Sequence, residues 1–148
     1  MPDLVSSKPR KRSATWAAQF LVAAELERHG YDVAFTMGSS TPVADLMAGH
    51  AATGEQFWVD VKGLWASNAW WGNAKPVRTN LFYVLVLVGE DRTKDRFFVL
   101  NQTEFNRLVE EYRLAHPSAK PVGGFNWGDP LKFEGHWEKL PGWGAPSN

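Results

Sequence analysis

The sequence predicts an α/β protein: a single three-layer α/β/α domain whose central mixed β-sheet lies between helices. Three stretches indicate this. Residues 14–29 carry apolar side chains over a broad helical surface, residues 57–62 alternate with the period of a strand, and residues 81–88 are apolar throughout. An alternating strand has one buried face, whereas a continuously apolar strand is covered on both faces, as in the centre of a sheet.

The composition favours one compact domain. With 148 residues, of which 44% are hydrophobic, the chain is long enough to bury a core. It has no cysteine, which excludes disulfides and Cys-based zinc sites and favours a cytoplasmic location. The longest apolar run, residues 81–88, is too short to cross a bilayer, and no signal-peptide pattern follows the basic N-terminal residues. We therefore expect no membrane association.

Three parts are expected along the chain. Residues 1–13 are basic and interrupted by proline, which predicts a flexible arm. Residues 14–120 hold the periodic segments and form the domain. Residues 121–148 are rich in Gly, Pro and Trp, and we expect an irregular aromatic tail that packs on the same domain.

The first half of the domain is expected to begin with a helix over residues 14–29, which Gly30 ends. Its broad apolar surface, which includes Trp16 and Phe20, should pack on the sheet. A short strand over 32–35 comes next. A Gly/Ser/Thr loop then leads into a second short strand that contains Asp45. Residues 49–54 read as a turn that joins this strand to residues 57–62 in a hairpin.

The second half begins with a long loop over residues 63–76. Strands are expected over 81–88 and 96–100, joined by a charged turn. Asn101 or Thr103 should cap a second helix that stops before Pro117. The predicted order is therefore helix, three strands, two strands, helix, followed by the irregular Trp-rich tail.

Two carboxylates and an ammonium are expected to converge in the hairpin. Asp60 and Lys62 lie two residues apart on an alternating strand and so share one face. Asp45 lies fifteen residues before Asp60 in the partner strand. Hard oxygen ligands hold Mg²⁺, and a nearby ammonium orients the attacking water and stabilises developing charge. This set suits metal-dependent hydrolysis of a phosphodiester.

The run Pro-Val-Ala-Asp at 42–45, followed by Asp-Val-Lys at 60–62, resembles the motif of the PD-(D/E)xK nuclease superfamily. That group includes restriction-endonuclease-like enzymes and archaeal-type Holliday junction resolvases. The resemblance covers residues 15 to about 112 and implies a restriction-endonuclease-like fold. It also implies that Asp45, Asp60 and the Val61 carbonyl bind Mg²⁺, with Mn²⁺ as a substitute, while Lys62 positions water.

Gln19 departs from the commoner pattern of this superfamily. Its members often carry a Glu in the first helix that reaches towards the metal, and counting back from Gly30 and Tyr31 places that position at Gln19. An amide binds Mg²⁺ less well than a carboxylate but can hold a metal-bound water. The resemblance therefore assigns Gln19 an assisting catalytic role. The alternative is a polar residue at the edge of the buried face.

Contacts to DNA are expected from two loops that flank the motif. The small hydroxyl residues before Asp45 could contact phosphate, and cations after Lys62 could do the same. Indole rings of the 63–76 loop either stack on bases or fold back as a small core that holds the loop. The expected contact residues are Ser39, Ser40, Trp65, Asn68, Trp70, Trp71, Lys75 and Arg78.

Three classes of function remain open. The first is a Mg²⁺-dependent endonuclease that acts on duplex or branched DNA, for which a homodimer would supply the two sites that cutting both strands requires. The second is a catalytically silent nucleic-acid-binding module of the same fold, with Gln19 as the sign of lost activity. The third is an aromatic-rich domain that binds protein or carbohydrate through its Trp loops.

Overall fold

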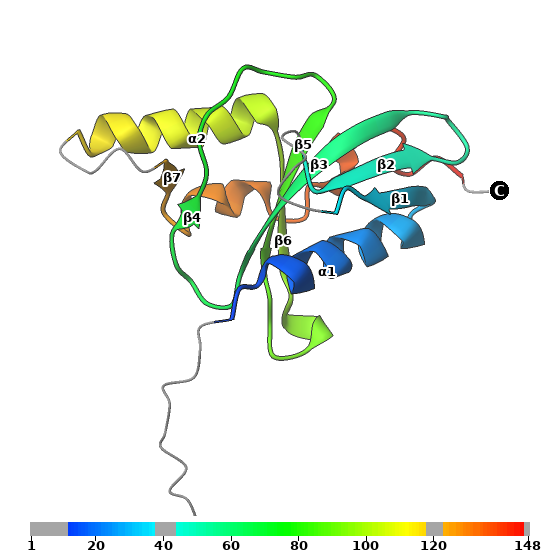
Figure 1. Ribbon diagram of the computed structural model, residues 1–148, viewed down its shortest axis with the longest axis horizontal. Coiled ribbons are helices and arrows are strands. Elements are labelled where there is room, and N and C mark those ends of the chain that lie inside the picture. The colour runs from blue at the N-terminus through cyan, green and yellow to red at the C-terminus, as the bar shows by residue number, and fades with distance from the viewer. Residues whose placement is uncertain (1–11, 38–43, 118–122, 147–148) are drawn as a thin grey trace, which may run out of the picture.

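The fold is a five-stranded mixed sheet with a helix on each face (Figure 1). The computed structural model describes residues 12–37, 44–117 and 123–146. The main elements are α1 (Thr15–Arg28), β1 (Tyr31–Phe35), β2 (Leu46–His50), β3 (Gln56–Leu64), β5 (Leu81–Leu87), β6 (Arg96–Asn101) and α2 (Gln102–Ala115). The prediction of an α/β protein with a mixed sheet is confirmed. Within the described residues, neither helix is long and apolar enough to cross a bilayer.

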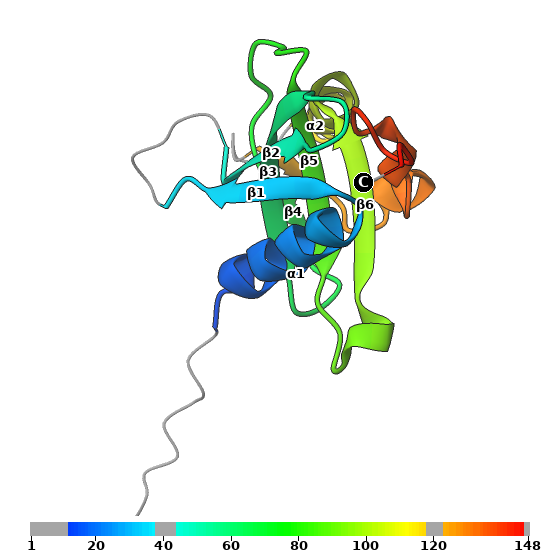
Figure 2. The ribbon, with the colours of Figure 1, turned by 90° about the vertical axis from the view of Figure 1, so that its right-hand side faces the viewer.

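The strands lie in the order β1-β2-β3-β5-β6, viewed from the β1 side in Figure 2. β3 and β5 are parallel, and the other neighbouring strands are antiparallel. Parallel strands need a crossover connection, which is usually a helix. Here residues 65–80 make the crossover and contain only the short strand β4 (Trp70–Trp71). The crossover starts three residues after Lys62 and therefore leaves β3 beside the predicted site.

α1 covers one face of the sheet. Its buried side chains Ala18, Val22 and Leu26 belong to one apolar cluster with the β3 residues at positions 57, 59 and 61. The odd-numbered residues of β3 thus face α1, and the even-numbered residues face the other way, since side chains alternate along a strand.

The expectation for Trp16 and Phe20 was wrong. Both residues are half-exposed, and their rings stack on each other with centroids 5.9 Å apart, instead of packing into the core of the sheet. The Phe20 ring meets the edge of Phe35 at the end of β1. The buried side of α1 is narrower than the apolar residues of the segment suggest, since it consists of Ala18, Gln19, Val22, Ala23 and Leu26.

α2 covers the opposite face. It begins with a capping box, in which the Asn101 side chain accepts from the Glu104 backbone N–H and the Glu104 side chain accepts from the Asn101 backbone N–H. Asn101 is therefore the cap, and not Thr103. The buried stripe of α2 includes Phe105 and packs with Tyr83 of β5. This face is the one that carries the even-numbered residues of β3.

The C-terminal segment packs against both apolar clusters, the one under α1 and the one under α2. The short strand β7 (Gly124–Phe125) pairs antiparallel with β4 and forms a separate two-stranded sheet. After β7 the segment forms two 3₁₀ turns, η2 (Asp129–Phe133) and η3 (Trp137–Lys139). A third such turn, η1 (Arg92–Lys94), lies earlier in the chain, between β5 and β6. Phe125 belongs to the cluster under α2, and Leu140 to the cluster under α1. The segment therefore braces the crossover loop from outside the main sheet.

Candidate active site

Asp45 lies directly before β2, at the end of the pairing between β2 and β3. Its backbone N–H donates to the Val59 carbonyl at 3.1 Å. Its side-chain Oδ2 accepts a hydrogen bond from the Val61 backbone N–H at 2.8 Å. In a regular ladder a backbone carbonyl would accept from such an N–H, so the carboxylate takes the place of a main-chain group. This bond holds the Asp45 side chain against the middle of β3.

Asp60 and Lys62 share the face of β3 that is turned away from α1. Lys62 Nζ lies 3.2 Å from Asp60 Oδ1, and both side chains are mostly buried. Because Val61 lies between these two residues, its bond to Asp45 brings both carboxylates and the ammonium together. The three predicted site residues are neighbours in space.

Burial and the neighbouring charges shift the pKa of Asp45. Burial raises the pKa of Asp45 above its usual value, and the negative charge of Asp60 raises it further. The hydrogen bond from Val61 and the positive charges of Lys62 and Lys75 lower it, but the net direction is upward. Two carboxylates close enough to repel each other gain stability when a cation binds between them.

A wall of two aromatic rings and a glycine holds Lys62. The rings of Tyr83 and Phe105 stack in parallel with centroids 3.8 Å apart. Lys62 Nζ lies 5.8 Å from each centroid. A Cβ added at Gly72 would lie 2.9 Å from Lys62 Cε and 2.7 Å from Phe105 Cζ, closer than carbon atoms tolerate. The lysine stem is therefore confined, and a methyl group at position 72 would force Lys62 or Phe105 to shift.

Sequence reasoning missed this wall. Tyr83 lies in register with Asp60 across the parallel pair β3–β5. Burial, followed by the negative charge of Asp60, raises the pKa of Tyr83 to about 12, so the phenol stays protonated at neutral pH. The sequence feature that could have revealed this contact is Tyr83 itself, the one hydroxyl-bearing residue within the apolar run 81–88. Nothing local to Gly72 or Phe105 marks them, because their contacts join segments that lie far apart in sequence.

Gln19 lies on the buried side of α1 and is 7% exposed. Within the described residues its amide has no hydrogen-bond partner, and so no hydrogen bond joins it to Asp45 or Asp60. α1 packs mainly on β3, the strand that carries the motif. The assisting role of Gln19 stays a prediction that depends on the resemblance.

The tryptophans of the crossover loop differ in exposure. The expectation that Trp70 contacts DNA was wrong: it is 1% exposed, its indole N–H donates to the Trp127 carbonyl at 3.1 Å, and its ring meets Phe98 edge-on. Trp71 is 60% exposed. Trp65 is also exposed, and the Arg12 guanidinium lies 4.8 Å from its ring centroid. The Trp65 indole N–H also donates to the Arg12 carbonyl at 2.9 Å, so Trp71 is the more accessible of the two rings.

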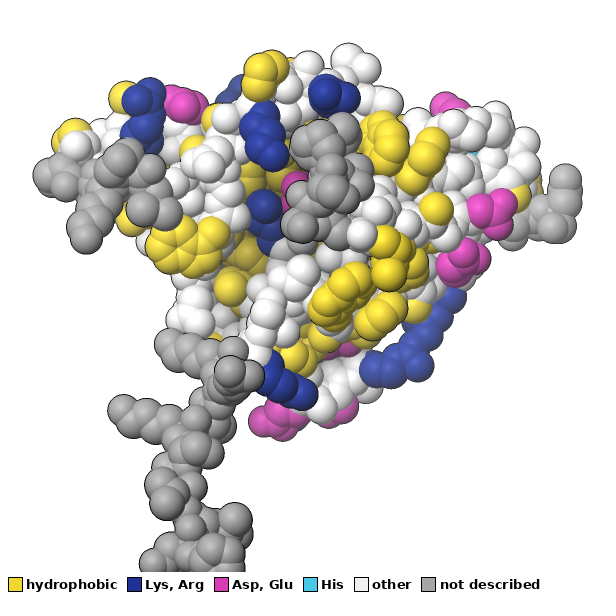
Figure 3. All heavy atoms as spheres, in the orientation of Figure 1, with side chains coloured by type: hydrophobic (Ala, Val, Ile, Leu, Met, Phe, Trp, Pro, Cys, Tyr) yellow, Lys and Arg dark blue, Asp and Glu magenta, His cyan; other side chains and the backbone are white. Residues whose placement is uncertain are grey.

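The remaining predicted DNA contacts fall into two groups. Asn68, Lys75 and Arg78 are exposed in the crossover loop. Lys and Arg side chains gather around an acidic side chain on the face seen in Figure 3. Ser39 and Ser40 lie outside the described residues.

α2 fixes the part of the loop that carries the two cations. The Lys75 carbonyl accepts from Asn106 Nδ2 at 2.6 Å, and the Arg78 backbone N–H donates to Gln102 Oε1 at 2.5 Å. Gln102 is buried although it is polar. Its bonds hold the loop backbone, so Lys75 is kept near enough to Asp45 to lower the pKa of that carboxyl.

The donor set suits a divalent cation with oxygen ligands. Asp45 uses Oδ2 and Asp60 uses Oδ1 in the contacts above, which leaves Asp45 Oδ1 and Asp60 Oδ2 without a hydrogen bond in the described part of the chain. Mg²⁺ is commonly bound through one or two carboxylates and completes its octahedron with water. Among the residues described, no group of three or more His, Cys, Asp or Glu side chains could hold a metal. Two carboxylates with free oxygens can serve as the protein ligands of a hydrated Mg²⁺ or Mn²⁺ ion.

Comparisons with protein-family models, with curated proteins and with solved structures found no match to this chain. A function is therefore inferred from the chemistry and geometry of the site.

Proposed function

We propose that this protein is a metal-dependent nuclease of the PD-(D/E)xK type, with a restriction-endonuclease-like fold, that hydrolyses phosphodiester bonds in DNA. One observation carries the proposal. The Val61 N–H binds the Asp45 carboxylate at 2.8 Å and so sets it beside the Asp60–Lys62 pair. This hydrogen bond from β3 to Asp45 places the Asp45 carboxylate close to the Asp60 carboxylate and the Lys62 ammonium.

Each residue has a distinct task in this proposal. Asp45 and Asp60, with the Val61 carbonyl, would hold Mg²⁺ or Mn²⁺. The bound cation would supply Lewis-acid polarisation of the phosphodiester and a water of lowered pKa. Lys62 orients the attacking water and stabilises the charge that develops on the phosphoryl oxygens. The wall of Tyr83, Phe105 and Gly72 keeps the lysine in position for both tasks.

The surroundings favour a phosphate-bearing substrate. Lys75 lies near Asp45, on backbone that α2 holds in place, and Arg78 follows on the same loop. Such cations neutralise backbone phosphates without reading sequence. Exposed indoles at positions 65 and 71 offer surfaces for stacking on unpaired bases.

A second candidate is the catalytically silent module that binds nucleic acid through the same surface. Gln19 is the observation that favours it, because a neutral amide stands where members of the resembled superfamily often carry a carboxylate. With two acids instead of three, divalent metal would bind more weakly. In that case binding of DNA would persist without hydrolysis.

The test is a cleavage assay on plasmid, single-stranded and branched DNA with Mg²⁺ or Mn²⁺ titrated. Asp60→Ala should abolish cleavage, and Lys62→Met should reduce it by roughly 10²–10³-fold while metal still binds. Glu111→Gln serves as the control, because Glu111 is an exposed acid on α2. An Asp60→Ala protein that cuts as well as the wild type would exclude this site as the catalyst. Wild-type protein that binds DNA but never cuts it would favour the silent module.

A further inference from the structure

The face of the sheet that carries Asp60 and Lys62 continues over β2 and β1. α2 packs on β5, β6 and β7. In the described part of the chain no helix covers the same face of the hairpin. Its side chains there include Ala34 from β1 and Met47 from β2, and Gly49 presents none. A solvated sheet face usually presents polar residues, whereas this one is small and apolar at its centre.

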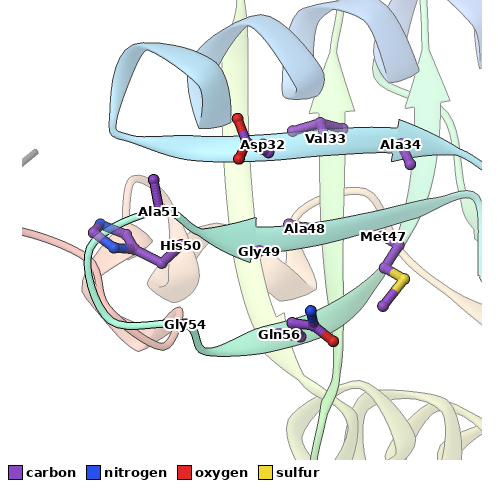
Figure 4. A pocket seen from close by; sticks show the side chains of 10 residues that line it. All are labelled: Asp32, Val33, Ala34, Met47, Ala48, Gly49, His50, Ala51, Gly54 and Gln56. Carbon is purple, nitrogen blue, oxygen red and sulfur yellow. The ribbon is translucent and has the colours of Figure 1, made fainter.

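A hollow of about 340 Å³ lies on this face (Figure 4). Gly49 and Ala34 leave its centre low, because one has no side chain and the other has only a methyl group. Met47, Gln56 and Asp32 rise around it from the three strands of the hairpin region. The hollow falls within the size range of small-ligand sites.

The lining selects the chemistry of the ligand. Among the residues that the structure describes, no Lys or Arg lines the hollow, and one carboxylate does. The side chains of Asp32 and Gln56 have no hydrogen-bond partner in the described residues. Asp32 can accept a hydrogen bond, and the Gln56 amide can donate and accept. The site therefore suits a neutral group with N–H donors, and it disfavours a phosphate.

The hollow lies on the same sheet face as the candidate active site. Gln56 and Asp60 are on the same face of β3, four residues or about 13 Å apart. Trp58 lies between them and is in register with Met47 at the rim of the hollow. Tyr83 and Phe105 lie on the other side of Lys62, so the hollow and these rings flank the site from opposite sides.

We infer that this hollow binds an unpaired nucleobase, within a few nucleotides of the phosphodiester at Asp45, Asp60 and Lys62. The inference rests on the proposed function, and it narrows the substrate. A base within a duplex is stacked and paired, so only a single-stranded or extruded base can enter a pocket on a sheet face. The substrate therefore carries unpaired nucleotides beside the bond that is cut.

The hollow can be filled without disturbing the fold. A Cβ at Gly49 would meet only Gln56 Cγ, at an ordinary 3.6 Å. Gly49→Val places a β-branched side chain in a strand, where it is tolerated, and Ala34→Val fills the same space from the edge strand. Ala24→Val is the control, because Ala24 is exposed on α1, outside the hollow. Thermal melting of each variant confirms that it is folded.

The probe is a fluorescein-labelled DNA hairpin with a short single-stranded tail. The duplex end fixes where each tail nucleotide lies along the protein. Binding to the full-length protein is measured by anisotropy in EDTA, so that cleavage does not interfere. Gly49→Val and Ala34→Val should each weaken binding about tenfold, and Ala24→Val should not. In a tail series with one abasic nucleotide, one position should weaken wild-type binding to a similar extent. At that position Gly49→Val should add no further loss, because both changes remove the same contact.

Equal binding by the wild type and both filling variants would overturn the nucleobase site and leave the nuclease proposal standing. A Gly49→Val protein that changes its mass in light scattering, with unchanged DNA binding, would assign the hollow to self-association and also overturn it. A wild type that neither binds nor cuts any nucleic acid would overturn both proposals.

Discussion

The two faces of β3 differ in burial and in polarity. Towards α1 the strand presents Phe57 and Val59, which lie within a closed apolar cluster. On the other face it presents Trp58, Asp60 and Lys62, all partly exposed. Under the proposed function, the alternation of side chains separates stability from chemistry, so a substitution on one face should leave the property of the other face nearly intact.

The largest effect is expected from Phe57→Ala. This ring is 1% exposed and contacts Tyr31 and Phe82, so its removal should lower the free energy of unfolding by about 3–5 kcal/mol. Trp58→Ala removes a larger side chain, but one that is only half-buried, and should cost clearly less. Urea unfolding followed by far-UV circular dichroism measures both. Equal losses would show that the two faces are equally part of the core.

Gly72→Ala should act on the chemical face, with a smaller effect on stability. The added methyl group meets Lys62 Cε and Phe105 Cζ, which costs about 1–3 kcal/mol in strain and displaces the lysine. We expect cleavage to fall by roughly tenfold or more, while Mg²⁺ binding, measured by titration calorimetry, changes little.

The matched control for that change is Gly128→Ala, because a Cβ there meets only Leu131 Cδ1 at 3.8 Å. A Gly72→Ala enzyme that cuts at the wild-type rate would show that the wall does not position Lys62.

Asp45→Asn should give the smallest effect, visible in the pH dependence of stability. The raised pKa means that folded Asp45 binds its proton more tightly than the unfolded chain does. Its contribution to stability is therefore greatest at pH below the ordinary Asp value of about 3.9 and declines as pH rises through the raised pKa. In EDTA the variant should melt higher than the wild type at pH 7 and should lack this part of the decline.

Thermal melts of both proteins from pH 3 to 7 test this, with Asp32→Asn as a control for loss of an exposed carboxylate. Mg²⁺ should stabilise the wild type more than Asp45→Asn, because the cation offsets the carboxylate charges. A variant that melts lower at pH 7 would mean that the Val61 bond to the ionised carboxylate outweighs its burial.

Local patterns predicted the main elements well. The helices, the hairpin and the apolar central strand each have a periodicity that few other structures satisfy, and the structure has them close to the expected bounds. Trp70 and Trp71 show the limit of such patterns. They are adjacent and chemically identical, yet one is buried and the other exposed, because β7 pairs with β4 from more than fifty residues away.

The sequence by itself determined which residues share a face of β3, because alternation is a property of the strand alone. Asp60 and Lys62 had to lie together, opposite Val61, in any sheet that contains this strand. Tertiary structure decided what surrounds them: the bond from Val61 to Asp45, the wall of Tyr83 and Phe105, and the hollow over Gly49. These features depend on how segments that are far apart in the sequence approach one another in space, and a local sequence pattern does not specify such contacts.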